Sequence, residues 1–200
     1  MARRPAGLVL LLVLVLAAAG CGGGGGSGGD DPGRFRGLVL EDRPVAATFR
    51  LRDQDGRLVS LADQRGRWVL MTFLYTWCPD VCPVIAGNLN QALRSAPAKQ
   101  AGLRVLSVSV DPARDTPAAA RKYARDHRLL PTFRWLLGTR AELARVWDAY
   151  DVAVLPGPKR TVSHSAIQLL IDPEGHERLV YDSQVQAADV VADLRTLLGE

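Results

Sequence analysis

A run of eight mostly apolar residues constrains the fold of this chain more than any other feature. WVLMTFLY occupies residues 68–75 and is rich in residues that favour β-structure. A strand that is apolar on both faces is buried on both faces, as in sheets that helices cover on each side. TWCPDVCP (76–83) ends the run with two cysteines, each followed by proline. We therefore expect a central, doubly covered strand that leads directly into a cysteine pair.

The rest of the chain alternates strand patterns with helical ones. ATFRL (47–51) and LVSL (58–61) flank an Asp-Gly turn and predict a β-hairpin. After the central run we expect a helix, a strand, a helix, a strand or irregular crossing, a helix, a long loop, two strands and a closing helix. These predicted elements occupy 84–96, 102–110, 117–127, 133–138, 139–150, 155–164, 165–172, 177–181 and 186–199. Strands that alternate with helices predict an α/β domain whose central mixed sheet is flanked by helices, and this order resembles a thioredoxin-like fold.

The first forty residues predict export and anchoring. A basic start and twelve apolar residues have the form of a secretory signal peptide, and the apolar run is shorter than the ~20 residues that span a membrane. Small residues precede Cys21, as at a bacterial lipoprotein cleavage site. We expect a signal peptide over 1–20, a lipidated Cys21 on a flexible Gly-rich tether over 21–40, and the folded domain over 41–200. The alternative is an ordinary secretory signal with an incidental cysteine.

These features place the domain outside the cytoplasm, on a bacterial membrane, where disulfides persist. The chain has 25 Lys and Arg against 21 Asp and Glu, but Arg3 and Arg4 belong to the predicted leader, which leaves 23 basic residues. No basic stripe with interleaved aromatic residues is present, so we expect no nucleic-acid partner.

Cys78 and Cys82 lie four residues apart. If a helix begins near Cys78, both side chains point from the same face, one turn apart. Their Cα atoms would then be roughly 6 Å apart, which a disulfide accepts. The same spacing lets two sulfurs converge on one ion, and a helix N-terminus favours the thiolate that both chemistries need. The spacing alone permits either a redox disulfide or a metal site.

A metal site needs a third ligand. His127 ends a predicted helix and His176 lies in a predicted hairpin turn, so we expect both to be exposed. His164 lies where the long loop meets a buried strand, which is at the rim of the cysteine loop if that strand is central. Two thiolates and one imidazole suit copper, Cu(I) above all. A structural zinc site would require a fourth protein ligand, and Asp80 could reach only with an awkward loop.

Three motifs in a fixed order resemble the Sco/SenC family of copper-binding proteins. They are CPDVCP (78–83), SVDPARDTP (109–117) and VSHSAIQLLIDPEG (162–175), and the resemblance covers about residues 45–198. It implies a membrane-anchored, thioredoxin-like copper chaperone that helps assemble the copper centre of cytochrome c oxidase. The implied partner is the copper-site subunit of that oxidase.

The family's copper ligands fall on Cys78, Cys82 and His164, and the two cysteines are also the implied redox pair that forms a disulfide. Two positions depart from the family pattern. Trp77 replaces His or Asn, which favours redox chemistry, and Ser163 replaces an Asp that could orient the neighbouring imidazole.

Two further interpretations stay open. Asp111 is expected to start the DPAR turn, with a supporting contact to the metal site as the alternative. In place of a copper chaperone, the chain could be a thiol–disulfide oxidoreductase that reduces the oxidase's copper-ligand cysteines. A thiol peroxidase is the weakest hypothesis, because Thr76 precedes Cys78 by two residues and peroxidases have that threonine three residues before the cysteine.

Overall fold

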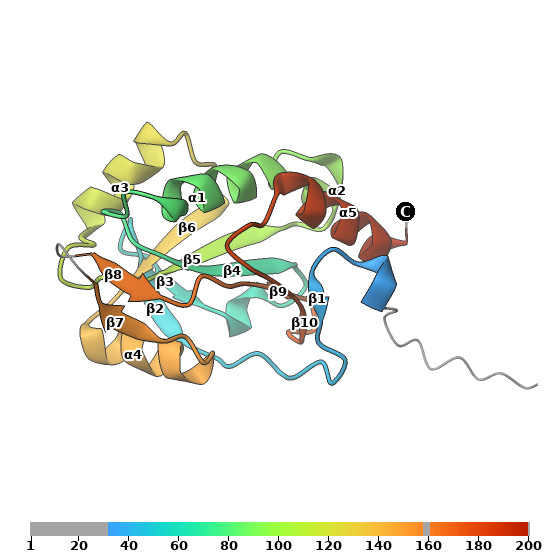
Figure 1. The fold of residues 1–200 in the computed structure, drawn as a ribbon, viewed down its shortest axis with the longest axis horizontal. Helices are drawn as coiled ribbons and strands as arrows, with labels where there is room; N and C mark the ends of the chain where they lie inside the picture. The colour runs from blue at the N-terminus through green and yellow to red at the C-terminus, as the bar shows by residue number, and fades with distance from the viewer. Residues whose placement is uncertain (1–31, 158–160, 200) are drawn as a thin grey trace, which may run out of the picture.

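Strand β4 (Val69–Leu74) is the centre of the fold, and all six of its residues are buried. Strand β5 (Arg104–Ser109) pairs with it in parallel, and β9 (Gln168–Ile171) pairs with its other edge in antiparallel orientation. The sheet is therefore mixed. The predicted central position of the apolar run is confirmed, because strands cover both edges of β4 and helices cover both faces (Figure 1).

The computed structural model describes residues 32–157 and 161–199, so the predicted signal peptide and Cys21 lie outside the described residues. The main sheet has the strand order β1-β10-β9-β4-β5-β6-β2-β3. Its remaining strands are β1 (Leu38–Val39), β2 (Arg50–Asp53), β3 (Leu58–Ser60), β6 (Phe133–Leu137) and β10 (Glu177–Tyr181). The predicted N-terminal hairpin is confirmed as the antiparallel pair β2–β3 at one edge of this sheet.

Helices lie on both faces of the sheet, as predicted. Figure 1 shows α1, α3 and α5 on one face and α4 on the other. The helices and short 3-10 turns are α1 (Val81–Ala92), α2 (Ala96–Gln100), α3 (Pro117–Asp126), α4 (Arg140–Ala149), α5 (Ala187–Leu198), η1 (Pro32–Arg34) and η2 (Ala62–Gln64). Thr116 and Thr139 begin α3 and α4, where each side-chain oxygen accepts a backbone N–H three residues later. None of the helices in the described part is long and apolar enough to cross a membrane.

Two local expectations were wrong. The segment 155–164 was predicted to be a loop, but it contributes to a second, two-stranded antiparallel sheet of β7 (Val154–Pro156) and β8 (Val162–His164). The helix after the cysteines was predicted over 84–96 and spans Val81–Ala92, so it includes Cys82 but begins after Cys78. The Pro-Asp pair after Cys78 delays the helix, since the residue before a proline avoids helical backbone angles.

An N-terminal arm packs on the domain ahead of residue 41. Phe35 is buried, and the backbone N–H groups of Arg36 and Gly37 donate to the two carboxylate oxygens of Asp193 in α5, at 2.8 and 2.9 Å. Residues 38–39 form β1 and pair with β10. The last part of the segment assigned to the tether is thus attached to the domain, and any free tether must end before Phe35.

Candidate metal centre

The cysteine pair lies at the junction between the central strand and its following helix. Cys78 is in the turn after β4, and Cys82 is the second residue of α1. The Cys78 N–H donates to the carbonyl oxygen of Tyr75 at 3.3 Å, and the Cys82 N–H donates to the Cys78 sulfur at 3.4 Å. Cys78 is 9% exposed and Cys82 is fully buried. Both are free thiols in this structure.

The pKa values of the two thiols are shifted in opposite directions. A hydrogen bond from the Cys82 thiol lowers the pKa of Cys78, and the backbone N–H groups of Asp80 and Cys82 lower it further, against burial, which raises it. The same bond to Cys78, together with burial, raises the pKa of Cys82. The pair therefore shares one proton at neutral pH, with the negative charge on Cys78 and the proton on Cys82. Thiolate is the form of cysteine that binds metals and attacks disulfides, so Cys78 is the candidate for both.

His164 ends strand β8 in the second sheet. Its Nδ1 lies 3.0 Å from the carbonyl oxygen of Ser165. A carbonyl oxygen can only accept, so Nδ1 carries the proton and the lone pair of Nε2 is free for a metal. Burial lowers the pKa of His164, which favours the neutral imidazole that metals bind. The carbonyl oxygen of Ser165 thus orients the imidazole ring of His164. Ser163, the preceding residue, is exposed and has no carboxylate that could do so.

Cys78 and His164 line one cavity of about 350 Å³. The other residues that line this cavity are Tyr75, Pro79, Asp80, Val81, Thr161, Val162, Ser163 and Ala166. Cys82 is fully buried and is not among the residues that line this cavity. Within the described ranges, no three His, Cys, Asp or Glu side chains are already gathered as a closed metal site. The structure therefore places Cys78 and His164 on one cavity, with Cys82 hydrogen-bonded to Cys78, and the assignment of the three residues as metal ligands stays a prediction.

A buried carboxylate that sequence reasoning missed supports the cysteine loop. One oxygen of Asp115 accepts both the backbone N–H and the hydroxyl of Thr76, at 2.9 and 2.6 Å, and the other accepts the Ser109 hydroxyl at 2.6 Å. Burial raises the pKa of Asp115, while these three donors lower it. Asp115 therefore ties the start of the cysteine loop to the end of β5. A second aspartate in SVDPARDTP, after a strand that carries serines, was the available signal.

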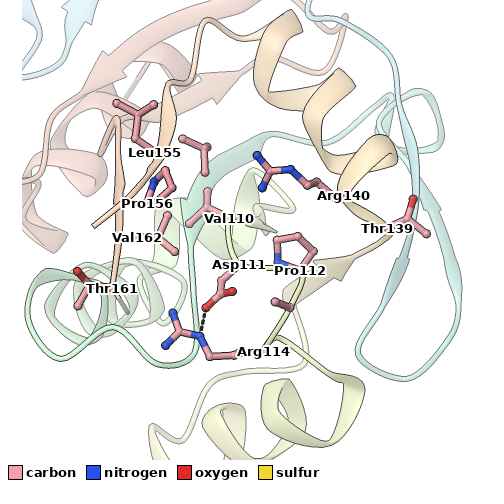
Figure 2. A pocket seen from close by; sticks show the side chains of 12 residues that line it. Val110, Asp111, Pro112, Arg114, Thr139, Arg140, Leu155, Pro156, Thr161 and Val162 are labelled. Carbon is pink, nitrogen blue, oxygen red and sulfur yellow. Dashed lines mark hydrogen bonds and ion pairs between the residues drawn. The ribbon is translucent and has the colours of Figure 1, made fainter. Parts of the chain in front are cut away.

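Asp111 has the first of its two predicted roles. It starts the turn, since its carbonyl oxygen accepts the N–H groups of Arg114 and Asp115. Its carboxylate forms an ion pair with Arg114 and lines a different cavity, of about 520 Å³, together with β7 and the start of α4. Figure 2 shows that pair as a dashed line, below Val110 in the view. No contact between the Asp111 carboxylate and either cysteine or His164 is present in the described part of the chain.

Four other residues that the sequence analysis considered are exposed or partly exposed. His127 is exposed at the end of α3, and the imidazole of His176 is partly exposed beside Asp172. Asp80 is exposed at the mouth of the cavity. Trp77, adjacent to Cys78, is 63% exposed and presents a large apolar surface next to the reactive sulfur.

The topology and the position of the cysteines define the class. Along the chain, the unit β4–α1–β5 is followed later by β9, β10 and α5. In the sheet, these strands lie side by side in the order β10-β9-β4-β5, and the cysteine pair lies where β4 meets α1. This is the thioredoxin-like fold that the sequence predicted. The chain belongs to the SCO1/SenC family, whose sequence model matches residues 39–199.

Comparisons with individual proteins agree with this membership. The "Protein SCO2 homolog, mitochondrial" of Bos taurus is 36% identical over 152 residues, which cover 72% of this chain and 56% of the bovine one. The chain thus spans about half the length of the curated relatives it matches. The structure of Bradyrhizobium japonicum ScoI with copper bound has a TM-score of 0.67 and 32% identity, and covers 76% of this chain and 99% of ScoI.

A third comparison concerns the fold alone. BsSco, described as a member of the Sco family of cytochrome c oxidase assembly proteins with a disulfide switch, has a TM-score of 0.66 at 24% identity. The match covers 79% of this chain and 94% of BsSco.

Proposed function

We propose that this protein is an extracytoplasmic, lipid-anchored copper chaperone that binds one copper ion through Cys78, Cys82 and His164. We propose further that it delivers the ion to the copper-site subunit of cytochrome c oxidase. The observation that carries the proposal is the single cavity that Cys78 and His164 line, with the imidazole Nε2 left free by the bond from Nδ1 to Ser165. The copper in ScoI and the assembly role named for BsSco support the cargo and the client.

The donor set fits copper better than zinc. Two sulfurs and one imidazole make a soft, three-coordinate site that suits Cu(I), and the imidazole extends it to Cu(II). Binding of the ion displaces the one proton that the cysteine pair shares, since thiolates are the ligands. Asp80 is the one carboxylate among the described residues that line this cavity, and it is exposed to solvent.

The metal test compares the two redox states of one protein. Purified full-length protein is reduced or oxidised anaerobically, loaded with copper and desalted, and its metal content is measured. We expect one copper per reduced chain and none per oxidised chain, because a disulfide leaves no thiolate for the ion. Equal stoichiometry in both states would remove Cys78 and Cys82 as ligands.

The anchor has a separate test. Cys21→Ser should release the protein from membranes without unfolding it, because the domain starts beyond the Gly-rich segment and is held by its own contacts. Membrane fractionation measures the release, and circular dichroism of the soluble form checks the fold. A Cys21→Ser protein that still sediments with membranes after leader removal would count against lipidation.

A second candidate is a thiol–disulfide oxidoreductase, favoured by the opposite pKa shifts of the two cysteines. The Cys78 thiolate would attack a partner disulfide and release one partner thiolate. The Cys82 thiol would then attack the mixed disulfide, release the second partner thiol and leave the Cys78–Cys82 disulfide. His164→Ala distinguishes the two functions, because exchange needs only the cysteines, whereas copper binding needs the imidazole as well.

A further inference from the structure

The ligands of the proposed copper site belong to two separate parts of the fold. Cys78 and Cys82 follow the central strand of the eight-stranded sheet, whereas His164 lies on β8, which pairs only with β7 among the described strands. No ladder of backbone hydrogen bonds therefore joins the histidine to the cysteines. Something else must set the distance between the imidazole and the sulfurs.

Tyr75 contacts both parts. It follows β4 directly and is buried. Its hydroxyl oxygen accepts the backbone N–H of Val162, in β8, at 3.4 Å. The edge of its ring meets the ring of His164, with centroids 6.0 Å apart and planes at 84°. Its carbonyl oxygen accepts the N–H of Cys78 at 3.3 Å. One residue thus contacts the backbone of the cysteine loop, the backbone of the hairpin and the imidazole itself.

The chemistry of a tyrosine fits this place. A phenol hydroxyl has one donor and two acceptor positions, so it can accept from Val162 and still donate to a sulfur. A perpendicular pair of rings at this separation is an attractive contact.

We propose that Tyr75 is a positioning residue that holds the β7–β8 hairpin, and with it His164, at the correct distance from Cys78 and Cys82. This inference rests on the proposed copper site. Tyr75 acts through His164 and not as a ligand, so it should matter most for the ion that depends most on imidazole. That ion is Cu(II), since two thiolates alone retain Cu(I).

The test is Tyr75→Phe, which keeps the ring and its contact with His164 and removes only the hydroxyl. In the metal-free, reduced, full-length protein, the Val162 amide should exchange its hydrogen faster than in the wild type, because its acceptor is gone. Cu(II) affinity should fall about three- to tenfold, the range that one net hydrogen bond contributes. Cu(I) affinity should change less than about twofold, since the sulfurs stay in place.

The matched control is Tyr181→Phe. Tyr181 lies on β10, away from the hairpin. Its hydroxyl is also buried and donates to the Asp193 carboxylate at 2.9 Å. It should lower global stability without changing the Val162 exchange rate or the ratio of Cu(II) to Cu(I) affinity. If Tyr181→Phe has the same effects as Tyr75→Phe, both report a general loss of stability and the proposal is wrong.

A double-mutant cycle with His164→Ala decides how Tyr75 acts. Added to His164→Ala, Tyr75→Phe should cause no further loss of Cu(II) affinity, because the group it positions is already absent. An equal further loss would mean that the hydroxyl acts through the cysteines, and would overturn the proposal. The amide exchange of Val162 needs no metal, so it tests the positioning role even if the wild-type protein binds no copper and the proposed function fails.

Discussion

The cysteine loop and the histidine hairpin meet at one cavity, but the fold supports them very differently. The cysteine loop (residues 75–82) lies between a fully buried strand and a helix, and Asp115 holds its start from beneath. The histidine hairpin, strands β7 and β8, belongs to no larger sheet, and its residue Leu155 is 61% exposed. Tyr75 provides two of its described attachments to the rest of the domain, and Val154 and Val162 pack against the core.

This difference bears on the proposed copper site. Its two proposed sulfur ligands are held by the core of the domain. Its proposed imidazole ligand lies on a two-stranded element outside the main sheet, where a lower local stability is expected. In the proposed site, the histidine could therefore approach or leave the ion while the thiolates stay in place. The predictions below test this contrast.

The largest effect is expected from the buried member of the cysteine loop. Cys82→Ser should lower Cu(I) affinity at least about a hundredfold, or about 2.8 kcal/mol, because a strong sulfur ligand is lost. It should also abolish the intramolecular disulfide. Competition with a Cu(I) chelator measures the affinity. A loss of less than tenfold would mean that Cys82 is a redox partner of Cys78 and not a ligand, and the contrast would reduce to one sulfur and one imidazole.

The support beneath the cysteine loop should come next. Asp115→Ala leaves the Thr76 N–H and hydroxyl and the Ser109 hydroxyl without their acceptor in a buried place. We expect a loss of about 2 kcal/mol or more in the free energy of unfolding, measured with denaturant. Asp42→Ala, at an exposed position, is the control and should change stability by less than about 0.5 kcal/mol. If Asp115→Ala and Asp42→Ala have the same free energy of unfolding, Asp115 does not stabilise the cysteine loop, and the contrast with the hairpin loses its main support.

The hairpin is tested by His164→Ala. Copper affinity should fall more than tenfold, which is more than about 1.4 kcal/mol, and the loss should be greater for Cu(II) than for Cu(I). The reduction potential of the Cys78–Cys82 pair should barely change, because the histidine is not part of the disulfide. If copper affinity is unchanged while the potential moves by tens of millivolts, the imidazole tunes a redox site and the copper proposal should be dropped.

The finest distinction lies within the cysteine loop. Because the pKa of Cys78 is lowered, its thiolate persists below the ordinary value of 9.0, and its rate of alkylation should fall only at a pH well below that value. Cys82 should stay unmodified in the folded protein, since it is buried and its pKa is raised. Cys82→Ala removes the hydrogen bond that lowers the Cys78 pKa most, so the midpoint of the alkylation profile should rise. An unchanged midpoint would contradict the shared proton.

Local patterns predicted most of the fold. The apolar run before the cysteines identified the central strand, and Thr116 identified the start of α3, because burial on both faces and helix capping are properties of a few adjacent residues. The predictions failed where longer contacts decide. Residues 155–164 contain the Pro-Gly and basic residues of a loop, yet β7 and β8 pair with each other across that segment. Arg36 and Gly37 follow a glycine-rich stretch, yet a carboxylate in the last helix accepts the backbone N–H groups of both.

The candidate site divides in the same way. By itself the sequence determined which residue types are present and predicted the chemistry of the site: two cysteines after a buried strand, and a histidine in the last of three ordered motifs. Only the tertiary structure decided which groups act on them. Thr76 meets Asp115 across 39 residues, and Tyr75 meets Val162 across 87. The pKa values of Cys78 and Cys82 move in opposite directions because the folded chain places the Cys82 thiol where it donates a hydrogen bond to the Cys78 sulfur, while burial raises both values.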